Sequence, residues 1–351
     1  MKKQLLLLVM MVLPLVASAD VAINEENFPD ANFRTYLLTQ WYGYDMVITN
    51  DEINSIDKIK VDKKAISSLK GIEFFTALTI LSCIENQLTS LDLSNNIALT
   101  QLSCWSNLLT SLDVSNCTEL TFLACESNRL TSLDVSKCTA LTEFRCDHNQ
   151  LSSLDVTHNI SLKYFTCSNN QLASLDVTHN IAITFLGCND NQLTSLDVTH
   201  NTVLKGLDVQ SNHLIYLDVS KNTALGSMMC WSNSIFGTNM DKLINDLPIK
   251  EDARIYIIST GDENEKNVCT KLQVEAAKSK GWTVYSVAKN DWPYDISEYT
   301  GSEPSAVGII SSESVKISAT YTLGGSPADS NSHGLSIVRM SDGMTKKVIV
   351  K

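Results

Sequence analysis

A repeat of 21 residues constrains the fold of this chain more than any other feature of its sequence. The tripeptide Leu-Asp-(Leu/Val) recurs at that interval, at residues 91–93, 112–114, 133–135, 154–156, 175–177, 196–198 and 217–219. An asparagine recurs with the same step, at Asn86, Asn107, Asn128, Asn149, Asn170, Asn191, Asn212 and Asn233. A unit this short cannot bury its apolar side chains alone, so neighbouring units must stack. The period therefore predicts a solenoid of eight stacked units, or rungs, over residues 73–236.

The apolar pattern inside each rung predicts a short strand. Residues 99–114, for example, follow the pattern LxxLxCxxNxLxxLxV, in which Leu102 and Cys104 alternate with polar residues. Stacked rungs then align their strands about 4.8 Å apart in a parallel sheet. The pattern resembles the leucine-rich repeat, LxxLxLxxNxL, in the short form of internalin-like bacterial surface proteins. This resemblance implies an α/β leucine-rich-repeat solenoid whose parallel sheet lies on the concave face.

Two columns of inward polar residues are predicted to be structural. The repeated asparagine lies where the chain turns inward after each strand, and its amide can bond backbone groups that burial would leave unpaired. A second inward column holds Asn or Cys, at Asn96, Cys117, Cys138, Asn159, Asn180, Asn201 and Asn222. A thiol is small and can donate weakly, so it can replace an amide there.

Most of the ten cysteines occupy one column, three residues before each repeated asparagine. The members of this column are Cys83, Cys104, Cys125, Cys146, Cys167, Cys188, Val209 and Cys230. The column could be a metal or redox array, but a valine within it favours a set of small buried hydrophobic side chains. A disulfide brings two Cβ atoms to about 3.8 Å, closer than in-register neighbours on parallel strands. We therefore expect free buried thiols and no cofactor.

Two further columns raise the question of a bound metal. The aspartates at 92, 113, 134, 155, 176, 197 and 218 could hold calcium between rungs, or each could cap the following turn by accepting from backbone N–H groups. No glycine-rich nonapeptide accompanies them, which favours capping. His158, His179 and His200 also stack, but lysines at 137 and 221 mark that column as a solvated loop position. We expect no metal in either column.

The ends of the solenoid need covers, because bare terminal rungs would expose the core. Residues 20–72 are the predicted N-terminal cap, with one helix opening after Asn27-Phe28-Pro29-Asp30 and a second starting within residues 49–53. This stretch resembles the Phe-Pro-Asp-x-x-Phe-Arg cap of secreted repeat proteins from Gram-negative anaerobes. Relatives can carry an EF-hand-like loop between the helices. Here only Asp45, Thr49 and Glu52 could ligate, too few for calcium.

At the other end, residues 237–289 are the predicted α/β cap. Helices and strands are expected over 240–247, 254–259, 268–280 and 282–287. Dipeptides such as Trp-Pro and Glu-Pro predict a linker over residues 290–308. A strand–turn–strand pattern then predicts a hairpin within a small β region, residues 309–351. That region resembles the C-terminal sorting domain of type IX secretion cargo, and a plain β cap is the alternative.

Residues 1–19 have the pattern of a signal peptide, in which Lys2 and Lys3 precede an apolar run and Ala17-Ser18-Ala19 is a small-residue cleavage pattern. No later apolar run is long enough to span a bilayer. Together with the sorting-domain resemblance, the signal-peptide pattern predicts a protein that is secreted or displayed on the outer surface of a Gram-negative bacterium. We expect it to be a monomer.

The 27 basic and 39 acidic residues give the chain a net charge of −12, which argues against nucleic acid as a partner.

The outward positions of the predicted strands change chemistry from rung to rung, as recognition requires, while the rest of the repeat is nearly constant. The candidate ligand-binding residues at these positions are Trp105, Phe122, Glu143, Arg145, Asp147, Tyr164, Phe185 and Trp231. Large rings exposed together on a sheet are typical anchors for a partner. The alternative is that the rings stack on one another only to stabilise short rungs.

The sequence thus predicts a binding protein rather than an enzyme. An adhesin-like protein of this kind would recognise a protein or a glycan, for instance one from a host. A structural component of a surface layer is the first alternative. A glycan-acting enzyme is the second alternative, and it would use Glu126 or Glu143 together with Asp147 as its acidic pair. No nucleophile–base pair has motif spacing, which argues against an enzyme.

Overall fold

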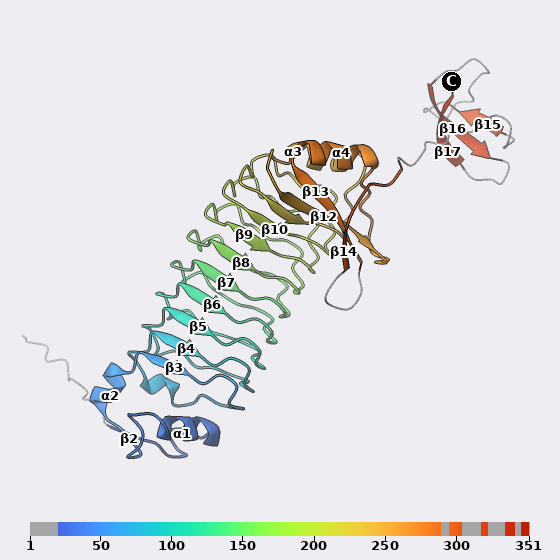
Figure 1. The fold of residues 1–351 in the computed structure, drawn as a ribbon. Helices are drawn as coiled ribbons and strands as arrows, with labels where there is room; N and C mark the ends of the chain where they lie inside the picture. The colour runs from blue at the N-terminus through green and yellow to red at the C-terminus, as the bar shows by residue number, and fades with distance from the viewer. Residues whose placement is uncertain (1–19, 289–294, 304–316, 322–333, 341–344, 351) are drawn as a thin grey trace, which may run out of the picture.

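The computed structural model of the chain describes residues 20–288, 295–303, 317–321, 334–340 and 345–350. Within them, twelve strands form one long sheet that follows the stack of repeats from β3 (Lys58–Lys60) to β14 (Asp295–Glu298) (Figure 1). Strands that are neighbours in the sheet are also consecutive along the chain. This order is the one that a stack of short repeats requires.

Eight short parallel strands form the repeat region. They are β4 (Ile80–Ser82), β5 (Gln101–Ser103), β6 (Phe122–Ala124), β7 (Glu143–Arg145), β8 (Tyr164–Thr166), β9 (Phe185–Gly187), β10 (Gly206–Asp208) and β11 (Ser227–Met229). Each strand pairs in register with the next, so that Gln101 lies beside Phe122, 21 residues on. The predicted leucine-rich-repeat solenoid of eight rungs is confirmed.

The middle residue of each strand points into the stack and fills its core. Leu102, Phe144 and Phe165 are fully buried, and the two phenylalanine rings stack with 5.5 Å between their centroids. Leu109 and Val114, which follow the strand within one rung, are equally buried. Burying a large apolar side chain contributes about 1.5–3 kcal/mol, so the repeated apolar positions supply most of the driving force for stacking.

The N-terminal cap consists of β1 (Val21–Ala22), α1 (Ala31–Leu38), β2 (Val47–Ile48), α2 (Asn50–Ser55) and the 3-10 helix η1 (Ile72–Phe74), with β3 joining the main sheet. Asp30 caps α1 by accepting hydrogen bonds from the backbone N–H groups of Asn32 and Phe33, both at 2.9 Å. Thr49 and Glu52 form a capping box at the start of α2. Both predicted helices are confirmed.

The C-terminal cap consists of α3 (Thr238–Asp246), β12 (Ala253–Thr260), α4 (Lys271–Ser279), β13 (Trp282–Ala288) and β14. The structure corrects two expectations. Helix α4 begins at Lys271 and not near residue 268, because Thr270 forms the capping box with Gln273. Residues 295–298, predicted to be linker, form an edge strand that pairs antiparallel with β13.

Beyond the cap, β15 (Ile317–Tyr321), β16 (Gly334–Met340) and β17 (Thr345–Val350) form a separate antiparallel sheet. The pairing of β16 with β17 confirms the predicted hairpin. The proposed signal peptide, residues 1–19, lies outside the described residues. No helix in the described part of the chain is long and apolar enough to cross a membrane.

Candidate functional site

The outward residues of neighbouring strands form rows across the sheet, since the strands pair in register. Phe122, Glu143, Tyr164 and Phe185 occupy the same register position on β6, β7, β8 and β9. Each of these side chains is partly exposed, whereas the next residue along its strand is buried. The alternation of a strand therefore presents this row on the outer face of the sheet, here called the strand face.

Two rings of the row stack directly. The centroids of Tyr164 and Phe185 are 4.9 Å apart, with an angle of 12° between the ring planes. Beyond Phe185, the row continues with Gly206, where an added Cβ would lie 2.8 Å from the Phe185 ring. Any larger residue at position 206 would push this ring away from the sheet. The glycine therefore lets the ring lie close to the backbone of β10.

Arg145 connects the remaining ring to this pair. Its guanidinium carbon lies 5.9 Å from the centroid of Phe122 and 5.0 Å from that of Tyr164. The same guanidinium forms an ion pair with Glu143. We call Phe122, Arg145, Tyr164 and Phe185 the aromatic–arginine row. Cation–π contacts of this kind hold the rings in one orientation, so the row is ordered before any ligand arrives.

The carboxylates beside the row differ in how well they are paired. Asp147 accepts a hydrogen bond from the Thr166 hydroxyl and another, at 2.8 Å, from the backbone N–H of Ser168. One carboxylate oxygen of Glu126, Oε2, is buried without a hydrogen-bond partner. Burial raises the pKa of Glu126 to about 7, and the negative charges of Asp147 and Glu143 add to the effect.

Asp208, on β10, is a second perturbed carboxyl on the strand face. Burial raises its pKa to about 7, with further contributions from Asp190 and Asp147. Nearby along the chain, Gln210 is 7% exposed, and its Oε1 atom has no hydrogen-bond partner. Neither residue was among the sequence-predicted site residues. Both occupy outward positions, but a spacing pattern carries no information about which outward side chain neighbours will bury.

The two predicted tryptophans do not join the row. Trp105 is partly buried and lies just after β5. It occupies the register position that Glu126 occupies in the next rung. The prediction of Trp231 as an exposed anchor is wrong, because its side chain is 6% exposed and packs edge-on against Tyr256 of β12, with 6.3 Å between ring centroids. The sheet continues into the cap beyond β11, and the cap covers this residue.

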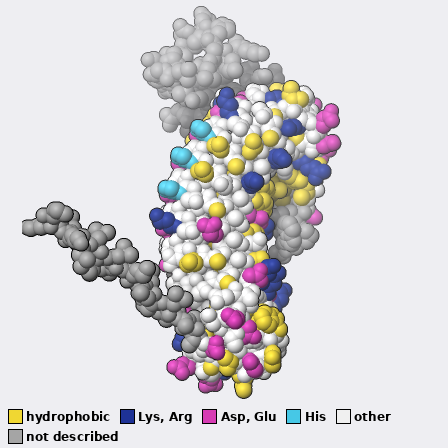
Figure 2. Space-filling view, turned by 90° about the vertical axis from the view of Figure 1, so that its left-hand side faces the viewer, with side chains coloured by type: hydrophobic (Ala, Val, Ile, Leu, Met, Phe, Trp, Pro, Cys, Tyr) yellow, Lys and Arg dark blue, Asp and Glu magenta, His cyan; other side chains and the backbone are white. Residues whose placement is uncertain are grey.

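The aspartate column behaves as a series of turn caps. Each aspartate accepts a hydrogen bond at 2.9 Å from the backbone N–H two residues on, as Asp155 does from Thr157. Hydrogen bonds from Thr157 lower the pKa of Asp155, which offsets the repulsion from the neighbouring Asp176. Histidine side chains lie in a row at the surface (Figure 2). Among the described residues, no group of three or more His, Cys, Asp or Glu is arranged to hold a metal ion.

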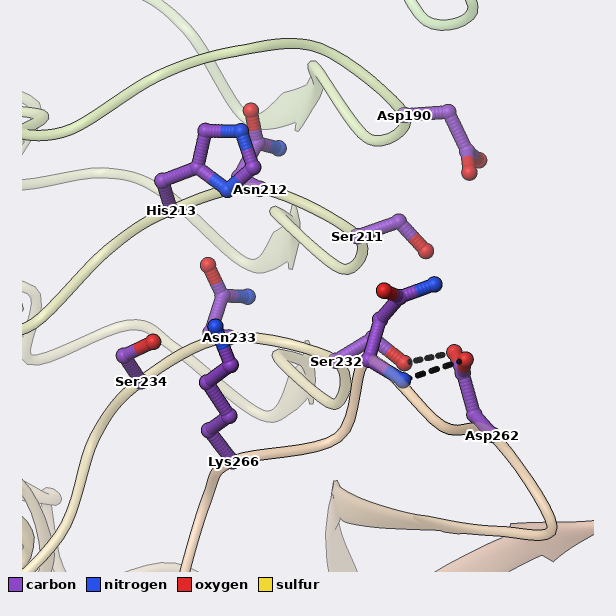
Figure 3. A pocket seen from close by; sticks show the side chains of 10 residues that line it. Asp190, Ser211, Asn212, His213, Ser232, Asn233, Ser234, Asp262 and Lys266 are labelled. Atoms are coloured by element: carbon purple, nitrogen blue, oxygen red, sulfur yellow. Dashed lines mark hydrogen bonds between the residues drawn. The ribbon is translucent and has the colours of Figure 1, made fainter.

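A polar cavity of about 320 Å³ lies between the turns of the last rungs and the segment that carries Asp262 and Lys266 (Figure 3). Ser232 donates a hydrogen bond to Asp262 across it at 2.5 Å. Ser211 and Ser232 both have positive φ, so they mark tight turns in successive rungs. The lining is hydrophilic and contains no Phe, Tyr or Trp, unlike the strand face.

The fold and the strand face together define a leucine-rich-repeat solenoid. No model of a known protein family matches the chain, and neither does any curated protein. A leucine-rich-repeat protein of Leptospira interrogans has a similar solved structure, with 19% identity, a TM-score of 0.57 and coverage of 66% of this chain and 62% of that one.

Two solved structures from Listeria monocytogenes are also similar. The functional domain of InlJ, described as including a cysteine ladder, is 21% identical with a TM-score of 0.42, over 95% of this chain and 99% of that one. Internalin C2 is 21% identical with a TM-score of 0.49, over 60% of this chain and 97% of that one. At such identities the similarity is one of fold.

Proposed function

We propose that this chain is a binding protein that recognises a partner macromolecule through its strand face. The observation that carries the proposal is the aromatic–arginine row, in which three partly exposed rings and one guanidinium are held in a fixed arrangement on the outer face of the sheet. Side chains that a partner would immobilise are already ordered here, which reduces the entropy lost on binding.

The pattern of variation within the chain supports the same surface. The inward positions repeat almost unchanged from rung to rung, since they have to pack in the same way. The outward positions on β6 to β10 instead combine rings, both signs of charge and two glycines. A purely structural surface-layer component would have no need of this diversity.

The proposal includes delivery to the cell exterior. Residues 1–19 have the charge, apolar run and small-residue pattern of a signal peptide, and residues 309–351 resemble a type IX sorting domain. An adhesin-like role on the outer surface of a Gram-negative bacterium would combine this delivery with the binding face. The ligand would be a protein or a glycan outside the cell.

A catalytic role for the acidic residues receives less support. A glycan-acting enzyme would need a carboxylate pair free to act on a substrate. Asp147 is already bonded by Thr166 and Ser168, and Glu143 is paired with Arg145. The cavity of about 320 Å³ is lined by other residues.

The test is a capture experiment with a double variant of the row. The mature protein would be used to probe a glycan array and to pull down proteins from host secretions, beside the variant Tyr164→Ser with Phe185→Ser. Each ring is expected to contribute about 2 kcal/mol, so the loss of both should reduce the affinity for the captured ligand by at least about a hundredfold. The matched control replaces two exposed apolar residues elsewhere, Tyr44→Ser with Ile160→Ser, which are 78% and 58% exposed. Equal capture by both variants and the wild type would refute the proposal.

A further inference from the structure

The strand face carries more negative than positive charge around the aromatic–arginine row. Its carboxylates are Glu126, Glu143, Asp147 and Asp208, and its cation in this region is Arg145. Arg145 and Glu143 neutralise each other through their ion pair. In the described part of the chain, Glu126, Asp147 and Asp208 form no ion pair, although the charge of Arg145 also acts on Glu126. Lys163 and Lys205 precede β8 and β10, at the opposite strand end from Asp147 and Asp208.

Two buried acceptors on this face also lack donors. The Oε2 atom of Glu126 and the Oε1 atom of Gln210 have no hydrogen-bond partner, and the Gln210 side chain is 93% buried. A buried acceptor without a donor is unfavourable. An ionised Glu126 and the amide oxygen of Gln210 can only accept, so a donor would satisfy each of them. The Nε atom of Arg145 on the same face is also buried without a partner and would need an acceptor, such as a backbone carbonyl of the bound segment.

Arg145 shows within the chain how such a donor fits the face. Its guanidinium lies between the rings of Phe122 and Tyr164 and against a carboxylate. Phe185, on the strand that follows Tyr164, offers a further ring. The neighbouring outward positions, Gly187 and Gly206, carry no side chains. A second cation approaching there would meet the same combination of ring and carboxylate, the latter supplied by Asp208.

We infer that the partner is a protein that presents a lysine- or arginine-rich segment, and that this segment lies across β6 to β10 with its cations against Glu126, Asp147 and Asp208. The inference rests on the proposed function, because it specifies the chemistry of what binds to the same face. The charge of −12 on the whole chain favours the approach of a basic segment over long range. Contact with the rings and carboxylates then fixes its position.

This binding should depend on pH. Burial raises the pKa of Glu126 and of Asp208 to about 7 each. The charged groups that face Glu126 are Asp147, Glu143 and Arg145, those that face Asp208 are Asp190 and Asp147, and buried cysteine thiols lie beneath both. A bound cation favours the ionised carboxylates and lowers both pKa values, so the basic segment displaces protons. Affinity should therefore increase from pH 6 to pH 8.

The experiment measures binding of an octalysine and an octaarginine peptide to the mature protein, beside an octaglutamate peptide. The test variant is Glu126→Gln with Asp208→Asn, which removes two charges that burial disfavours and so should fold. The matched control, Glu26→Gln with Glu251→Gln, removes two exposed carboxylates far from β6 to β10 in sequence. We expect both basic peptides to bind, at least a tenfold loss in the test variant, and less than a twofold change in the control. The increase in affinity from pH 6 to pH 8 should be absent from the test variant.

Several outcomes would overturn the inference. Equal weakening in the control would mean that only the net charge attracts the peptides. Absence of peptide binding, or capture of a neutral glycan or of a second copy of this chain by the row, would assign the face to another kind of ligand. In those cases the Tyr164→Ser, Phe185→Ser variant would still lose capture, and the proposed function would stand. If that variant also captured its ligand normally, the proposed function would fail as well.

Discussion

Each repeated asparagine joins two rungs through its side chain. The Asn149 amide donates to the backbone carbonyl groups of Cys125 and Cys146, both at 3.1 Å, and accepts from the N–H of Leu130 at 3.0 Å. These three backbone groups belong to the buried turn and have no partner in the sheet ladder. One side chain thus satisfies donors and acceptors that would otherwise oppose stacking.

Asn149→Ala should therefore destabilise the protein strongly. It removes the partner of the buried Leu130 N–H and one of the two asparagine donors to each of the Cys125 and Cys146 carbonyl groups, for an expected loss of about 2 kcal/mol in the free energy of unfolding. Urea unfolding followed by circular dichroism measures it. The adjacent Gln150→Ala, at an exposed position, serves as the control and should change the free energy by less than about 0.5 kcal/mol. Similar values for both variants would show that the asparagine bonds are dispensable.

The cysteines yield a second prediction at the residue scale. All ten are buried as free thiols. Burial raises the pKa of the Cys104 thiol to about 12, so it stays protonated and shielded. A thiol reagent at pH 8 should therefore find almost none reactive in the folded protein and ten after unfolding without reductant. Fewer than about eight after unfolding would indicate disulfides.

The pKa of Glu126 gives a pH dependence of stability. Because burial raises it to about 7 in the folded protein, the folded state holds this proton more tightly than the unfolded state does. The stabilisation is complete below the usual carboxyl pKa and is lost as the pH rises through about 7. Since the group is partly screened by solvent, we expect Glu126→Gln to gain about 1 kcal/mol relative to wild type between pH 5 and pH 8. Urea midpoints at both pH values, with Glu119→Gln as control, measure this. A constant difference between the two proteins would contradict it.

Residue positions were predictable where the period determined burial and unpredictable where neighbours did. The inward roles of Leu102, Cys104 and Asn107 follow from spacing alone, because every rung packs in the same way. The burial of Trp231 depends on Tyr256, which lies outside the repeat and breaks its period. No pattern internal to the rungs could have distinguished Trp231 from an exposed ring.

At the scale of elements, capping residues were the most informative signals. Asp30 and Thr49 mark the starts of α1 and α2, since each side chain accepts from the first turn of its helix. The edge strand β14 gave no such signal. Its four residues are all exposed, so it lacks an apolar face, and only its pairing with β13 defines it as a strand.

The edge strand should nevertheless stabilise the cap. Besides its ladder with β13, the segment that follows it places the Tyr299 and Ser302 hydroxyls 3.2 Å from the Cys269 carbonyl oxygen. A chain shortened to end at residue 288 loses these contacts and exposes the edge of β13. We expect its free energy of unfolding to be about 2 kcal/mol lower than that of a chain ending at residue 303. We also expect it to aggregate more readily. Equal urea midpoints and equal solubility of the two shortened chains would show that β14 is unimportant.

At the scale of the whole molecule, stability should be close to a sum over rungs and the contacts between neighbouring rungs. The sheet makes contact only between strands that are consecutive along the chain, so no rung depends on a distant one. The sequence could predict this arrangement because the period never varies over the repeat region. It could not predict the aromatic–arginine row as a unit, since that depends on how four side chains from neighbouring strands orient one another.

Deletion of one whole period tests whether the rungs are interchangeable. Removing residues 87–107 takes out β5 and joins Asn86 to Leu108, so every inward column stays in phase and β4 can pair with β6. This chain should fold cooperatively. The slope of its free energy of unfolding against urea concentration should fall by less than about a tenth, in proportion to the surface lost. Removing only residues 87–96 breaks the period between β4 and β5, so the rung at this junction would expose apolar residues and bury polar ones, while the later rungs stay in phase with one another. That chain should lose cooperative unfolding across the junction and be strongly destabilised there, as urea unfolding followed by circular dichroism and size-exclusion chromatography would show. If both deletions behave alike, the rungs do not act as equivalent stacking units, and the stability of the solenoid resides in contacts specific to each rung.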